Sequence, residues 1–225
     1  MRRRKLFGQH PAAPGWAGRR VLQVAHRLNE ECIAALANAA AAEHRAADFN
    51  LIVELSELWM ALDQAAIARA ARCPVLLLDL NFARADWWHG AARGAAHPAS
   101  RVLNGGVFPI EIPRDVLREV LTETWSAHRS MPRAVNLIFG MRPAVGEAIA
   151  SLRVSAIERI VLEHASELRP RFGETLDFWR KLLQVSLDAD AEGLADLHLY
   201  ALQLLGRNLD LHADSSSPNE RTGSP

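Results

Sequence analysis

Few side chains in this sequence stand at the spacing that catalysis or metal binding requires. The two cysteines, Cys32 and Cys73, do not form a CxxC pair, and no histidine or cysteine stands around them at zinc-finger spacing. We expect both thiols to be reduced and buried as small apolar residues of the core. His164 falls on the apolar face of a predicted helix, which favours a hydrogen-bonded core histidine over a metal ligand.

Paired carboxylates and nucleotide-binding loops are the next candidates. Asp190 and Glu192 flank one alanine near a predicted helix start, where acidic side chains suit the helix dipole, and this role is favoured over paired-carboxylate catalysis. The sequence contains no GxxxxGK[ST], GxGxxG, HExxH or GxSxG motif. We therefore expect no catalytic site, no metal, no cofactor and no small-molecule substrate, and predict that the chain is not an enzyme.

The N-terminal stretch could contact nucleic acid. Residues 1–29 hold no acidic residue and seven basic ones. These are Arg2, Arg3, Arg4, Lys5, Arg19, Arg20 and Arg27. Such an arm can lie along phosphates and release counterions, or it can remain a solvated tail.

A second basic stretch surrounds Phe172 and Trp179. Its basic residues are Arg169, Arg171, Arg180 and Lys181, and the acidic residues Glu167, Glu174 and Asp177 interleave with them. This mixture favours a salt-bridged surface over a DNA-binding face, although Arg169 and Arg171 remain candidates for DNA contact.

A pair of aromatic residues follows an aspartate in both halves of the chain, as Asp86-Trp87-Trp88 and as Asp177-Phe178-Trp179. Trp87, Trp88 and Trp179 are expected to be core or interface anchors rather than parts of a ligand cage, because large aromatic side chains usually fill interiors and interfaces. A partner interface is the alternative position for the same residues.

Composition limits the classes of protein that remain. The chain has 225 residues, is 49% hydrophobic and has a formal net charge of 0, whereas a domain that binds DNA alone is usually basic. A DNA role would therefore need a local patch or a partner. No apolar run approaches the roughly 18 residues of a membrane span, and no apolar segment follows the basic start as in a signal peptide. We therefore expect a soluble, cytoplasmic protein with no membrane contact.

Helical periodicity dominates the sequence and predicts an all-α fold. The apolar positions that define the helix faces are Val21, Val24, Leu28, Cys32, Ala35 and Leu36; Leu58, Trp59 and Leu62; Ile67, Ala70 and Ala71; Val116, Leu117, Val120, Leu121, Thr124 and Trp125; Val145, Ile149 and Leu152; Ile157, Ile160, Val161, His164 and Leu168; Leu176, Trp179, Leu182 and Leu183; and Leu194, Leu197, Ala201, Leu204 and Leu205. Ser56 and Ser155 are candidate N-caps, and Pro143 suits a first helical turn. Residues 75–82 could form either a short strand or a buried extended segment.

Breaker residues and periodicity together divide the chain. We expect a disordered basic arm over 1–18, a first helical unit over 19–93, a Gly- and Pro-rich linker over 94–113, a second unit with C-terminal helices over 114–209, and a disordered polar tail over 210–225.

The two units match each other in order, which indicates an internal repeat. Asn50-Leu51-Ile52 recurs as Asn136-Leu137-Ile138, Ala66-Ile67-Ala68-Arg69 as Ala156-Ile157-Glu158-Arg159, Leu78 and Phe82 as Leu168 and Phe172, and Asp86-Trp87-Trp88 as Asp177-Phe178-Trp179. The offset grows from 86 to 90 within a helix, a change of about one helical turn that preserves the apolar face. We expect two divergent tandem copies arranged with pseudo-two-fold symmetry, although chance similarity between Ala-rich helices could produce part of the match.

The repeat unit resembles the FlhD family, the D subunit of the bacterial flagellar transcriptional activator. The second copy carries the resemblance over Asn136-Leu137-Ile138-Phe139-Gly140-Met141, Ile149-Ala150-Ser151-Leu152, Ile157 and Leu168-Arg169-Pro170-Arg171-Phe172. The first copy departs from it, with Glu54 where the second has Gly140. The resemblance covers residues 22–88 and 114–180.

The resemblance implies a helical protein that works with a second subunit on promoter DNA, with no catalytic residue to carry over. Because the family is dimeric, a tandem chain could reproduce the dimer internally. We expect a transcription-regulator subunit that binds a protein partner or itself, and DNA together with that partner. A protein–protein adaptor in a motility or secretion assembly, with no DNA role, is the alternative.

Overall fold

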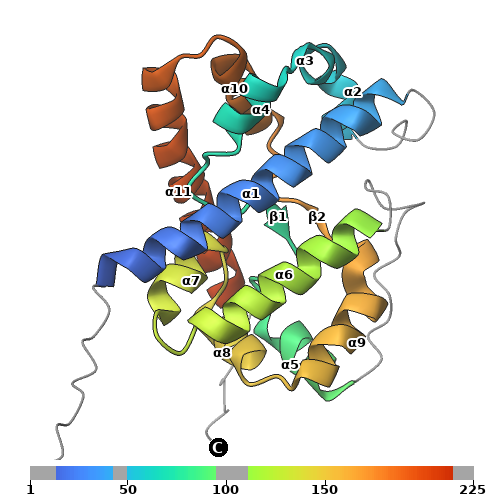
Figure 1. Cartoon of the computed structure of the whole chain (residues 1–225), viewed down its shortest axis with the longest axis vertical. Helices are drawn as coiled ribbons and strands as arrows, with labels where there is room; N and C mark the ends of the chain where they lie inside the picture. The colour runs from blue at the N-terminus through green and yellow to red at the C-terminus, as the bar shows by residue number, and fades with distance from the viewer. Residues whose placement is uncertain (1–13, 43–49, 95–110, 215–225) are drawn as a thin grey trace, which may run out of the picture.

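A computed structural model describes residues 14–42, 50–94 and 111–214, and the described chain is almost entirely helical (Figure 1). The elements in chain order are α1 (Pro14–Ala41), α2 (Asn50–Glu54), α3 (Ser56–Ala61), α4 (Gln64–Ala70), β1 (Leu78–Asp79), α5 (Ala85–Arg93), α6 (Glu111–Ala127), α7 (Pro132–Ile138), α8 (Pro143–Ala150), α9 (Val154–His164), the 3-10 turn η1 (Ala165–Glu167), β2 (Arg169–Pro170), α10 (Leu176–Leu187) and α11 (Ala191–Asp214). The predicted all-α class is confirmed. None of the helices in these ranges is long and apolar enough to cross a membrane.

Helix α1 runs through the middle of the molecule and contacts elements from both halves, namely α2, α3 and α4 on one side and α6 and α7 on the other (Figure 1). Its buried face is the predicted one, with Val21, Leu28, Cys32 and Leu36 withdrawn from solvent. Burial raises the pKa of the Cys32 thiol and raises that of Cys73 to about 12. Both cysteines are free and buried, so the predicted apolar role is confirmed.

Helix ends differ from the expected boundaries in three places. Helix α1 begins at Pro14, inside the expected arm 1–18, because proline is well tolerated in the first turn of a helix. Helix α6 begins at Glu111 for the same reason, with Pro113 in its first turn, and so shortens the expected linker 94–113. Helix α11 continues to Asp214, past the expected end at 209. The rest of the arm, linker and tail lies outside the described residues.

The expected serine caps are also wrong. Ser56 and Ser155 lie inside the first turns of α3 and α9, whose N-cap positions are taken by Leu55 and Arg153 without a side-chain hydrogen bond. Asp190 lies at the start of α11, as expected, and it caps this helix, since its Oδ1 accepts the amide of Gly193 at 3.0 Å.

Residues 75–82 are an extended segment that holds a two-residue strand, so both alternatives for this segment are partly correct. Strand β1 pairs with β2 in an antiparallel ribbon, with Leu78 opposite Pro170 and Asp79 opposite Arg169. The sequence match aligns this segment at an offset of 90 residues, whereas the contacts of Trp88 and Trp179 recur at an offset of 91. At 91, Leu78 corresponds to Arg169 and Asp79 to Pro170, so each strand position pairs with the counterpart of its neighbour. A two-fold axis passing between the strands would produce this register.

One helix from each half of the chain, 19–93 and 114–209, packs against the helices of the other half, and we call these two the exchanged helices. Helix α5 packs on α8 and α9 of the second half, and α10 packs on α2, α3 and α4 of the first. The buried apolar side chains of both halves form one continuous core. The segments 19–93 and 114–209 are therefore interlocked and share their interior.

Several contacts recur at matching positions in the two halves. Trp88 Nε1 donates to the carbonyl of Leu80 at 3.2 Å, and Trp179 Nε1 donates to that of Arg171 at 3.0 Å, in both cases eight residues earlier in the chain. Asn81 and Phe172, 91 residues apart, both have positive φ, at 52° and 58°.

The arginines of the repeated Ala-Ile-x-Arg sequence also make equivalent hydrogen bonds. Arg69 Nε donates to the carbonyl of Ser186 near the end of α10 at 2.7 Å, and Arg159 Nη2 donates to that of Ala91 near the end of α5 at 2.8 Å. Each arginine thus binds the C-terminal turn of the exchanged helix, where a positive charge suits the helix dipole. These correspondences are consistent with a duplication, which itself stays a prediction.

Candidate functional site

The central ribbon and the loop that follows β2 enclose a buried charged side chain, that of Arg171. Its side chain is 4% exposed, and the guanidinium donates to four backbone carbonyls. These are the carbonyls of Leu76 at 2.8 Å, Leu78 at 2.9 Å, Phe139 at 2.9 Å and Gly140 at 3.3 Å. Arg171 therefore ties the ribbon to the turn between α7 and α8.

The backbone around Arg171 is shaped to admit the guanidinium. Gly140 has φ of +62°, and a Cβ at this position would lie 2.6 Å from Arg171 Nη1. Glycine is therefore required here both by the backbone conformation and by the space that Arg171 occupies. This explains why the second copy carries Gly140, whereas the first has Glu54 at the corresponding position.

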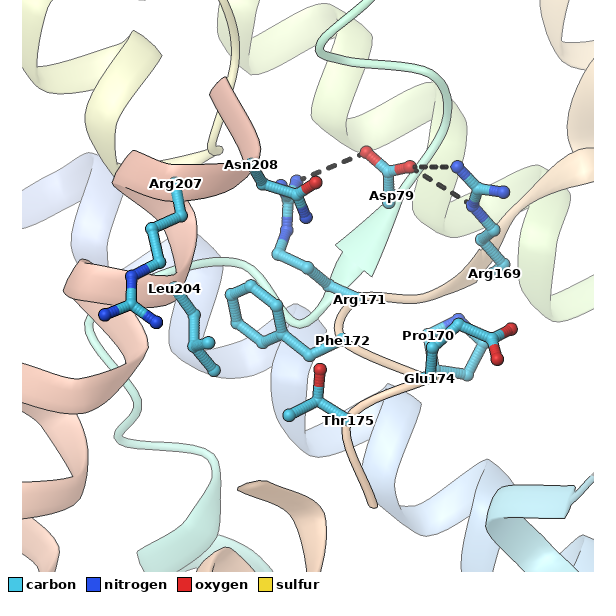
Figure 2. Close-up of a pocket in the computed structure, with 11 residues that line it drawn as sticks. Asp79, Arg169, Pro170, Arg171, Phe172, Glu174, Thr175, Leu204, Arg207 and Asn208 are labelled. Atoms are coloured by element: carbon cyan, nitrogen blue, oxygen red, sulfur yellow. Dashed lines mark hydrogen bonds and ion pairs between the residues drawn. The ribbon is translucent and has the colours of Figure 1, made fainter. Parts of the chain in front are cut away.

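The charge of Arg171 is balanced by Asp79. Asp79 Oδ1 lies 3.7 Å from Arg171 Nη2, and Asp79 Oδ2 accepts from Arg169 Nη2 at 3.0 Å (Figure 2). Burial lowers the pKa of Arg171, and the nearby Asp79 carboxylate acts in the opposite direction. Because guanidinium titrates far above neutrality, Arg171 stays charged.

A pocket of about 450 Å³ opens beside this cluster, between the loop after β2 and α11. Figure 2 shows Leu204, Arg207 and Asn208 of α11 on one side and Pro170, Glu174 and Thr175 on the other. Arg171 and Phe172 form the floor. Such a lining supports recognition of a polar or charged group by hydrogen bonds and ion pairing.

The described residues do not bring together the groups of a nucleophilic or metal site. No group of three or more potential ligands among His, Cys, Asp and Glu is found within the described ranges. His164 is buried as predicted, with Nδ1 2.7 Å from Glu167 Oε1 and its ring 4.9 Å from that of Trp87.

The basic candidates for DNA contact are placed differently from one another. Arg2, Arg3, Arg4 and Lys5 lie outside the described residues. Arg19 and Arg20 are exposed near the start of α1, and Arg20 Nη2 pairs with Glu123 Oε2 at 3.2 Å. Arg169 is exposed but pairs with Asp79. Arg171 is buried among carbonyls, so its proposed contact with DNA is wrong for this structure.

The tryptophans proposed as a partner interface lie in the core. Trp88 and Trp179 are fully buried and Trp87 is 6% exposed, so the partner-interface alternative is wrong and the core position is correct. The ring of Trp179 lies 5.7 Å from that of Trp59, which joins α10 to α3. These rings fix the exchanged helices in place by apolar burial.

Sequence reasoning did not find two residues that organise this region. Asn29 of α1 donates to the carbonyl of Val75 at 3.0 Å and accepts the amide of Leu77 at 2.7 Å, and so holds the extended segment that enters β1. Nothing in the sequence near Asp79 indicates its role, because its charged partners Arg169 and Arg171 are 90 and 92 residues away. An asparagine on the apolar face of α1 was the one local sign that a backbone segment is bound there.

Comparison with known proteins gives no match for this chain among protein-family models, curated proteins or solved structures.

Proposed function

We propose that this chain is a non-enzymatic regulatory subunit of the cytoplasm, resembling the FlhD family, that acts with a protein partner on DNA. The observation that carries the proposal is that equivalent contacts recur 90 or 91 residues apart on the two sides of the antiparallel ribbon, namely those of Trp88 and Trp179 and those of Arg69 and Arg159. Together with the exchange of α5 and α10, this recurrence supports a chain that reproduces within itself the arrangement of a dimeric unit.

The site supports binding better than it supports chemistry. Its charged groups are already engaged, with Arg171 held by four carbonyls and Asp79 shared between Arg169 and Arg171. A preformed cluster of this kind gives the surface around the pocket a fixed shape. A surface of fixed shape can bind a partner without the entropy cost of ordering side chains and loops, a cost that would otherwise weaken the affinity.

A specific observation also favours the adaptor alternative. The folded arginines that were candidates for DNA contact are largely occupied, since Arg171 is buried and Arg169 and Arg20 pair with carboxylates. Charge that is neutralised locally contributes little to the release of counterions from DNA. DNA contact by this chain therefore depends on the N-terminal arm and on the partner.

Affinity capture from the native host, followed by mass spectrometry and DNA titration of the captured complex, tests the proposal. The regulatory function predicts a complex that binds DNA more tightly than the chain alone, with an affinity that falls linearly with the logarithm of salt concentration. A captured complex that shows no DNA binding even at low salt would support the adaptor instead.

A further inference from the structure

The two ends of the molecule carry opposite charge. Residues 50–68 contain no lysine, arginine or histidine, whereas residues 124–146 contain no aspartate or glutamate. The acidic corner consists of Val53, Glu54, Glu57 and Met60, on α2 and α3. The basic corner consists of Arg129, Arg133 and Leu137, at the turn between α6 and α7 and on α7.

Each corner combines exposed charge with an exposed apolar side chain. Val53 and Met60 are 49% and 61% exposed in the acidic corner, and Leu137 is 54% exposed in the basic one. The charged members of both corners are exposed as well. An apolar centre with a charged rim is the usual composition of a protein contact surface.

The acidic corner is also hollow. A cavity of about 440 Å³ is lined there by residues that include Glu54, Glu57, Arg180 and Gln184. Arg180 pairs with Asp177 at 2.9 Å, so Glu54 and Glu57 leave a negative charge in the cavity. A guanidinium group on a long side chain is the group that such a cavity fits.

The corners cannot neutralise each other within one chain. They lie beside opposite ends of α1, with α2 and α3 near its C-terminal end and α7 near its N-terminal end (Figure 1). The 28 residues of α1 span about 40 Å at 1.5 Å per residue, several times the Debye length of about 10 Å at 0.1 M salt.

We propose that the acidic corner of one copy of this chain binds the basic corner of a second copy, head to tail. The occupant follows from charge: contact between two identical corners would bring like charges together, whereas contact between unlike corners of two copies pairs Glu54 and Glu57 with Arg129 and Arg133. Such a heterologous contact leaves one corner free on each terminal copy, so it builds rings or open chains. The proposal is independent of the DNA function.

Sedimentation of the full-length protein with charge-reversed variants tests this contact. The variants are Glu54→Arg with Glu57→Arg in the acidic corner, and Arg129→Glu with Arg133→Glu in the basic corner. A matched control reverses two exposed acidic residues of α11, Asp196→Arg with Asp210→Arg. All the substituted side chains are exposed, so the fold should be retained.

The wild type should associate at low salt as concentration rises, and should dissociate as salt is added. Each corner reversal should weaken association by roughly ten- to thirtyfold, because two attractive pairs become repulsive. The α11 control should associate like the wild type. An equimolar mixture of the two reversed variants should associate again, since each acquires the charge that complements the other.

Three outcomes would overturn the contact. The first is a wild type that stays monomeric at low salt up to about 0.5 mM. The second is association that both reversals leave unchanged, which would indicate a symmetric contact elsewhere. The third is a mixture of the reversed variants that remains monomeric.

Discussion

Replacement of Arg171 by methionine should destabilise the protein far more than the same change two residues away at Arg169. Both changes remove one positive charge beside Asp79. Only the first removes the donor of the four backbone carbonyls around Arg171, which we call the carbonyl cage. The Arg169 side chain, in contrast, is 64% exposed.

The expected magnitudes follow from these contacts. Four hydrogen bonds at about 1 kcal/mol net each give about 4 kcal/mol, and carbonyls left buried without a donor add to that cost. Removing a buried charge returns part of its desolvation penalty, so we expect a net loss of about 3–5 kcal/mol for Arg171→Met. For Arg169→Met the loss of an exposed ion pair should cost about 0.5–1 kcal/mol.

Urea unfolding followed by tryptophan fluorescence measures both values, since Trp179 bonds to the carbonyl of Arg171 itself. If Arg171→Met does not fold, Arg171→Lys provides the comparison, because a lysine keeps the charge but cannot reach four carbonyls at once. Equal destabilisation by the changes at positions 171 and 169 would refute the view that the cage organises the ribbon.

Three further changes have defined outcomes. A protease site inserted in residues 95–110 and then cleaved should leave the two halves as one species in gel filtration, because α5 and α10 are exchanged; separation of the halves would show that the interlocked core is wrong. Stability should fall as pH drops below about 6.5, because burial lowers the pKa of His26 and of His198, with His198 and Arg72 lowering that of His26 further. His26→Gln should flatten this dependence in denaturation curves, and an unchanged curve would exclude His26 as its source. Deletion of residues 1–13, which removes four positive charges and no negative one, should weaken DNA binding and lower the salt slope by up to about 0.9 per lost phosphate contact; an unaltered slope would remove the arm from the DNA contact.

The sequence predicts most helices here because burial leaves a periodic apolar stripe on each of them. Short helices escape this signal: α7 has 7 residues, or about two turns, and α5 is recognised in the sequence only by its tryptophans. Leu204 shows the opposite error, since its periodic position predicts burial whereas it is partly exposed and lines the pocket beside Arg171.

The site was harder to predict because its partners come from distant parts of the chain. Arg171 stands among alternating acidic and basic residues, a pattern typical of a solvated surface, and nothing local shows that residues 76–78 and 139–140 supply its carbonyl cage. The exchange of α5 and α10 likewise cannot be predicted from the sequence, because periodicity shows which face of a helix is buried but not which helix covers that face.

Chromatin immunoprecipitation of the full-length protein in its native host tests the proposed regulatory function most directly. We predict enrichment at discrete promoter regions that disappears when the captured protein partner is deleted. A protein that is expressed and assembled with its partner, yet shows no enrichment at any DNA region, would contradict the proposed function.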